Sequence, residues 1–171
     1  DQAVVNDMAN QSFDVDYVRV YQKDASVYEA AEANIKKPES AKNKFREADA
    51  NGNYILNADF AKDINGINPE DLTSNWGLHL ETDAKDSTFK VSDNSIKITP
   101  PAEGSVTHAV QLLQQGVPMY RGWEYELTFD AVADEDRTMV VDVEGPDHGW
   151  TRYMADTTFD ITKEKKTFTK T

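Results

Sequence analysis

The stretch WEYELTF, residues 123–129, has the pattern of a half-buried β-strand. Aromatic and aliphatic side chains occupy its odd positions, and glutamate or threonine occupies its even positions. Because successive side chains of a strand point to opposite faces, Trp123, Leu127 and Phe129 are predicted to face a core while Glu124 and Glu126 face water. An antiparallel sheet with one wet face accommodates this alternation.

Similar short runs recur along the rest of the chain, separated by Gly, Pro, Asn and Asp. Strands at this spacing predict an all-β fold, a jelly-roll β-sandwich. The Ser92-Asp93-Asn94 triplet is the predicted turn of one hairpin. The runs are Tyr54–Phe60, Trp76–Glu81, Phe89–Val91, Ser95–Thr99, Thr107–Leu113, Trp123–Val132, Thr138–Glu144, Tyr153–Ile161 and Lys166–Thr169.

Three compositions divide the chain. Residues 1–23 contain a strand in which Phe13, Val15, Tyr17, Arg19 and Tyr21 alternate with Asp14, Asp16, Val18 and Val20. Residues 24–52 are rich in Ala, Glu and Lys, and predict a partly helical linker, with a docked helix as the alternative. Residues 53–171 carry the β-sandwich. The chain begins without methionine and is expected to be a piece of a longer protein.

Composition excludes several classes of function. The 171 residues include 31 acidic and 18 basic side chains, a formal charge of −13, so nucleic-acid binding is not expected. No apolar run approaches the roughly 20 residues of a membrane span. There is no cysteine, and the three histidines are scattered, so a metal-dependent hydrolase is a weak alternative. Walker, dinucleotide-binding and nucleophile-elbow motifs are missing as well.

Aromatic residues in loops beside amide-bearing strands favour carbohydrate recognition. Trp76 follows a polar loop, and Trp150 and Tyr153 follow GPDHG. A pyranose ring stacks its C–H face on a flat aromatic ring, and its hydroxyls need donors and acceptors such as glutamine. Gln111 and Gln115 lie at alternate positions of one run. The alternatives are that Trp76 belongs to the core and that the glutamines are simply solvated.

The segment SFDVDYVRVYQ, residues 12–22, resembles the final strand of family 16 glycoside hydrolases, the laminarinase and lichenase group. The resemblance implies that a catalytic domain precedes this chain. That domain itself is absent, because the catalytic motif of the family is not found in the sequence. The chain alone is therefore predicted not to be an enzyme.

The residues from 54 onward resemble family 4 carbohydrate-binding modules. The matching text includes ILNADF (55–60), SNWGLHLE (74–81), HAVQLLQQGV (108–117), GWEYELTFDA (122–131) and GPDHGWTRY (145–153). The resemblance implies a secreted, non-catalytic module that binds a β-1,3- or mixed-linked β-1,3/1,4-glucan and targets an attached endo-glucanase. The alternative is a sandwich that packs domains and binds no sugar. The residues implied in sugar binding are Trp76, His79, His108, Gln111, Gln115, Trp150 and Tyr153.

The same resemblance implies a structural calcium ion held by Asp59, with closing strands of the module missing from this chain. The segment VDYVRV, residues 15–20, looks much like one missing strand. The strand of residues 13–21 is therefore expected to dock at the sandwich edge left open, in its own or a neighbouring copy, where Asp16 would act as a calcium ligand.

Overall fold

The computed structural model describes residues 13–22 and 46–171, and within them the all-β prediction is confirmed. In this part of the chain, no helix is long and apolar enough to cross a membrane. The strands are β1 (Phe13–Gln22), β2 (Gly77–Leu80), β3 (Thr88–Ser92), β4 (Ser95–Thr99), β5 (Val110–Leu113), β6 (Tyr125–Ala133), β7 (Arg137–Gly145), β8 (Thr151–Ile161) and β9 (Lys166–Lys170); two short 3-10 helices are η2 (Thr82–Ala84) and η3 (Pro146–His148).

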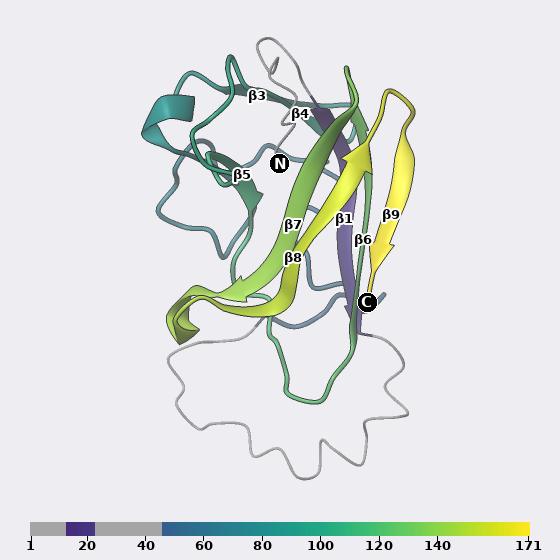
Figure 1. Cartoon of the computed structure of the whole chain (residues 1–171). Coiled ribbons are helices and arrows are strands. Elements are labelled where there is room, and N and C mark those ends of the chain that lie inside the picture. The colour runs from purple at the N-terminus through teal and green to yellow at the C-terminus, as the bar shows by residue number, and fades with distance from the viewer. Residues whose placement is uncertain (1–12, 23–45) are drawn as a thin grey trace.

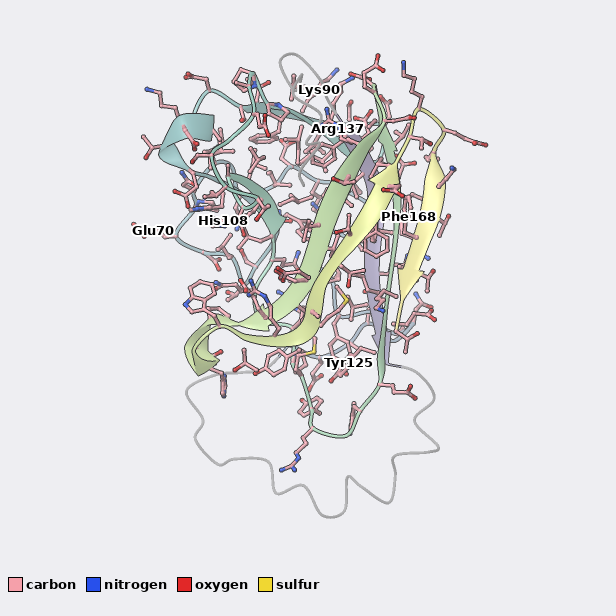
Figure 2. The ribbon with its side chains drawn as sticks, viewed as in Figure 1. Glu70, Lys90, His108, Tyr125, Arg137 and Phe168 are labelled. Atoms are coloured by element: carbon pink, nitrogen blue, oxygen red, sulfur yellow. The ribbon has the colours of Figure 1, made fainter. Side chains whose placement is uncertain are left out.

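One layer of the sandwich is a five-stranded antiparallel sheet in the order β3-β4-β1-β6-β9. Register places the apolar residues of all five strands on one face: Phe13 lies opposite Ile98 and Ala133, and Phe129 lies opposite Phe168. The ring of Phe168, which Figure 2 labels, stacks on that of Phe129 at 5.3 Å between centroids. The hydrophobic core lies against this face of the sheet.

The second layer consists of two separate two-stranded sheets, β2–β5 and β7–β8. Leu78 and Leu80 of β2 pack on Ile96 and Ile98 of β4 in one core cluster. In the other cluster, Met139, Val141, Met154 and Phe159 of the β7–β8 hairpin pack with β1, β6 and β9, and Figure 1 shows this hairpin lying across the front of β1 and β6. Both small sheets thus cover the same face of the large sheet, so their outward faces look to the same side of the molecule.

The segment predicted to be the terminal strand of an upstream domain is β1 of this sandwich, hydrogen-bonded between β4 and β6 of its own chain. It lies in the interior of the sheet, not at an edge. That these residues also form the last strand of a hydrolase domain stays a prediction. The predicted helical linker lies, for residues 24–45, outside the described residues.

Strict alternation along β1 was the wrong prediction. A register shift between Val15 and Tyr17 places a bulge at Asp16, so Phe13, Val15, Val18 and Val20 share the core face. An extra residue in one strand reverses the side of everything beyond it. The arginine Cζ of Arg19 then lies 4.8 Å from the centre of the Tyr17 ring on the opposite face.

The run from Tyr54 to Phe60 is a loop, although a strand was predicted. Asn57 and Phe60 have φ of 49°, a left-handed conformation that a regular strand does not adopt. The buried side chain of Asn53 accepts hydrogen bonds from the backbone N–H groups of Val20 and Ile55, each at 3.0 Å. Side-chain bonding of this kind competes with regular ladders. By contrast, the predicted turn at Asp93 and Asn94 is confirmed, with φ of 53° and 57°.

Asp14 gives a pH-dependent prediction about this sheet. Burial is the main cause that raises its pKa above the ordinary 3.8, Lys97 opposes the rise, and Asp134 and Asp16 add to it. Because the folded state disfavours the ionised carboxylate, this group costs stability as the pH rises from about 3.8 through the raised pKa. Asp14→Asn should therefore stabilise the protein at pH 7 by less than about 1 kcal/mol, since the group is partly solvated. Urea titrations at pH 7 and pH 3 check this: the gain must vanish at pH 3.

Candidate functional site

Trp150 is presented to solvent at the closed end of the β7–β8 hairpin. Its side chain is 63% exposed, the largest exposure among the large apolar residues described. Trp150 has φ +61°, directly after Gly149 at +64°, and its N–H donates to the carbonyl of Gly145 at 2.9 Å. A bulky side chain in the left-handed region costs on the order of 1–3 kcal/mol, and such strain concentrates at functional sites.

Tyr153 lies beside this tip and is 46% exposed. Its ring rests on Gly145: a Cβ added there would lie 2.9 Å from the phenol oxygen and 3.0 Å from Cε2. In the β7–β8 register, Met154 lies opposite Val143 and Arg152 opposite Glu144, so Tyr153 is the extra residue of a bulge. Bulges re-aim side chains next to binding sites. The glycine and the bulge together set the position of the Tyr153 ring against the backbone of the hairpin.

Arg152 is surrounded by three carboxylates on the outward face of the hairpin. Its guanidinium pairs with Asp142 at 3.6 Å, with Asp156 at 2.9 Å and with Glu144. Burial raises the pKa of Asp142, Arg152 opposes that rise, and Asp156 adds to it. The cluster thus fixes donors and acceptors around Arg152, which lies between Trp150 and Tyr153 in the sequence.

A second group of polar residues lies on the outward face of β2–β5. His79 and Gln111 are directly opposite each other in the ladder, so their side chains share one face, while Leu78 and Leu112 pack on the core side. The Nε2 of His79 lies 3.2 Å from Oε1 of Glu81. The β2–β5 face thus joins two of the predicted site residues.

His108, labelled in Figure 2, precedes β5 and is exposed. It lines an open depression of about 410 Å³ together with Glu81, Asp83, Ser105 and neighbouring residues. The backbone N–H of Ser105 donates to Asp83 at 2.6 Å, and hydrogen bonds to Ser105 lower the pKa of that carboxyl. Glu81 therefore links His79 to the depression that contains His108.

Gln115 is exposed beyond the end of β5, and its backbone is fastened on both sides. Its N–H donates to the carbonyl of Leu72 at 2.6 Å, and its carbonyl accepts a hydrogen bond of 2.6 Å from Arg46. The neighbouring Gln114 points elsewhere: its amide exchanges two 2.9 Å hydrogen bonds with the backbone of Leu56. Gln114 is thus structural, whereas Gln115 leaves its amide at the surface.

Trp76 is placed in the core, as the structural alternative expected. It is 6% exposed, its ring lies 5.7 Å from that of Phe60, and its Nε1 donates to the carbonyl of Asn57 at 3.2 Å. No face of this ring is left for a sugar, and we leave Trp76 out of the site. Trp123, predicted to be a core residue, is half-buried ahead of β6 and lies 4.7 Å from the ring of Tyr120.

The two predicted calcium ligands, Asp16 and Asp59, contact other residues of the chain. Asp16 is ion-paired with Lys165, and Asp59 is exposed and accepts the N–H of Ala61 at 3.2 Å. Among the described residues, no group of three or more His, Asp or Glu side chains could hold a metal ion. Calcium takes six to eight oxygen ligands. The residues as arranged do not fit that set, and structural calcium stays a prediction.

Sequence reasoning missed Arg152 and Glu81 as site residues. Asp142 and Glu144 alternate with Val141 and Val143 in the sequence, a pattern that places both carboxylates on one face of the strand. Their arginine partner comes from the neighbouring strand across an irregular register, which the sequence pattern of one strand cannot reveal.

Comparison with known proteins agrees with this geometry. Residues 52–171 match the model of the family CBM_4_9, described as a carbohydrate binding domain. Neither the curated proteins nor the solved structures gave a significant match. The matched segment contains both outward polar groups and the exposed aromatic tip. The chain belongs to the CBM_4_9 family of carbohydrate-binding domains, which bind carbohydrate and are non-catalytic.

Proposed function

We propose that this domain binds a β-1,3- or mixed-linked β-1,3/1,4-glucan on the outward side of its second layer. The exposure of Trp150 on a strained backbone is the observation that carries the proposal. A ring held open to water at the cost of strain gains most when it stacks on a ligand. β-Linked glucose suits it, because equatorial substituents leave both faces of the pyranose ring lined by C–H groups.

Polar residues on the outward side of the second layer supply the hydrogen bonds that sugar hydroxyls need. Arg152 offers guanidinium N–H donors while Glu144 and Asp142 offer acceptors, and each is held by the others. His79 and Gln111 offer an imidazole and an amide on the same side of the molecule. A long polymer contacts several such groups at once, so modest individual contacts add up.

The linkage and the biological role rest on the resemblance of residues 12–22 to the last strand of family 16 hydrolases. That resemblance supports a glucan with β-1,3 bonds. It also supports a role in which the module keeps a secreted endo-glucanase close to its polysaccharide. The module itself contributes binding, and the attached enzyme contributes hydrolysis.

Calorimetry with laminarin, barley β-glucan and cellohexaose tests the proposal. We expect binding to the first two ligands. Trp150→Ala should weaken it by about tenfold or more, as expected for the loss of a central aromatic contact. Tyr17→Ala is the matched control, because Tyr17 lies on the opposite face of the large sheet beside Arg19. The Tyr17→Ala variant should bind both glucans with the affinity of the parent chain.

Each failure has a distinct meaning. Equal affinities for the parent and Trp150→Ala would remove Trp150 from the site. Binding of cellohexaose alone would contradict the proposed linkage. No binding of any of the three by the folded parent chain would favour the domain-packing alternative.

A further inference from the structure

The strand β1 has an unusual relation to the family domain. It lies outside the matched residues 52–171, yet it occupies the middle of the five-stranded sheet. Without β1, that sheet separates into β3–β4 and β6–β9, because β1 alone pairs with both β4 and β6. The domain therefore contains a slot for one extended strand, which we call the β1 slot: the facing edges of β4 and β6 with residues 53–58.

The β1 slot satisfies the backbone of its strand on both sides. Phe13 to Val15 pair with β4, and all of β1 except the bulged Asp16 pairs with β6. Where β4 ends, the entry segment takes over: Val18 N–H donates to the carbonyl of Ala58 at 2.8 Å, and Tyr54 N–H donates to that of Val20 at 3.0 Å. This is strand addition, in which backbone hydrogen bonds supply affinity.

Side chains make the β1 slot selective. Val15 and Val20 are each 4% exposed and belong to the two different core clusters, so β1 links both halves of the core. The bulge at Asp16 places the inward residues correctly in only one register, and Asp16 there pairs with Lys165. A one-residue slip would turn these valines to water. The β1 slot is therefore selective for a strand with the inward apolar residues and the bulge that β1 has.

We propose that the β1 slot is a strand-binding site that the β1 of a second copy can occupy, giving a strand-exchanged dimer. Residues 23–45 connect β1 to Arg46, and 23 residues span at most roughly 76 Å when extended, enough to reach a second molecule. A strand in its own slot and a strand in a partner's slot make the same contacts. The balance is then set by the effective concentration of the chain's own strand, on the order of millimolar for linked partners.

The experiment uses the full chain carrying donor or acceptor fluorophores. Chains unfolded and refolded together at about 1 mM should be roughly half exchanged, whereas refolding at about 10 µM should give on the order of one per cent. Chains that are refolded separately and then mixed serve as the control and should show little transfer at short times. Absence of mixed dimers after joint refolding at millimolar concentration would overturn the exchange.

A second measurement tests the β1 slot itself. Val20→Asp should prevent the chain's own strand from docking, because it places a charge in the core. A synthetic peptide of residues 13–22 should restore the thermal transition of this variant, and the same peptide carrying Val20→Asp should not. Equal effects of both peptides, or of neither, would refute a selective strand site. None of these readouts involves sugar binding, so the result is independent of the proposed function.

Discussion

Arg46→Ala is expected to lower the free energy of unfolding by about 3 kcal/mol, because one guanidinium donates to four acceptors in three segments of the sandwich. Its Nη1 donates to the carbonyl of Tyr54 at 2.9 Å and to Oε1 of Gln114. Its Nη2 donates to the carbonyls of Thr73 and Gln115, each at 2.6 Å. Burial lowers the pKa of Arg46, which reflects its partial removal from water. The substitution by alanine removes the hydrogen-bond donors from all four acceptor oxygens.

Urea denaturation followed by tryptophan fluorescence measures this loss. Arg46→Lys should recover only part of it, since a single ammonium group cannot reproduce the planar fork. Arg121→Ala, at an exposed position, is the control and should change stability by less than about 0.5 kcal/mol. An Arg46→Ala midpoint within error of the parent would contradict the role assigned to this residue.

Trp76→Ala is expected to cost about 3–5 kcal/mol, the usual loss for a buried aromatic residue. The variant removes the ring that contacts Phe60 and leaves the carbonyl of Asn57 without the indole donor. We expect a cooperative unfolding transition at much lower temperature in calorimetry. Trp76→Phe should retain most of the packing and lose mainly the hydrogen bond, about 1 kcal/mol.

Trp150→Ala provides the opposite case. Because this side chain is 63% exposed, its removal should leave the midpoint of unfolding nearly unchanged while binding is lost. The two tryptophans thus separate stability from recognition. If Trp150→Ala destabilised the protein as much as Trp76→Ala, the exposed ring would be structural and the proposed site would have to move.

Much of the fold was predictable because strand patterns are local. The β6 alternation placed Leu127 and Phe129 in the core, and the predicted strand Ser95–Thr99 has the observed bounds of β4. The loop at residues 54–60 was missed, because its conformation depends on Asn53 bonding to a strand more than 30 positions away.

The candidate site was predicted only in part for the same reason. Trp150 and Tyr153 stand out as aromatic residues after a glycine-rich turn. Nothing in the sequence distinguishes their exposure from the burial of Trp76, since all three follow polar loops. The partners of Arg152 depend on two register shifts between β7 and β8.

Sequence alone determined the fold class, the positions of most strands and the family, because apolar alternation and turn residues act within a few positions of one another. Only the tertiary structure decided which side of β1 faces the core, where that strand lies in the sheet and which tryptophan is exposed to solvent. These depend on a single extra residue at Asp16 and on pairings between distant segments, whose free energies arise only when the strands come together.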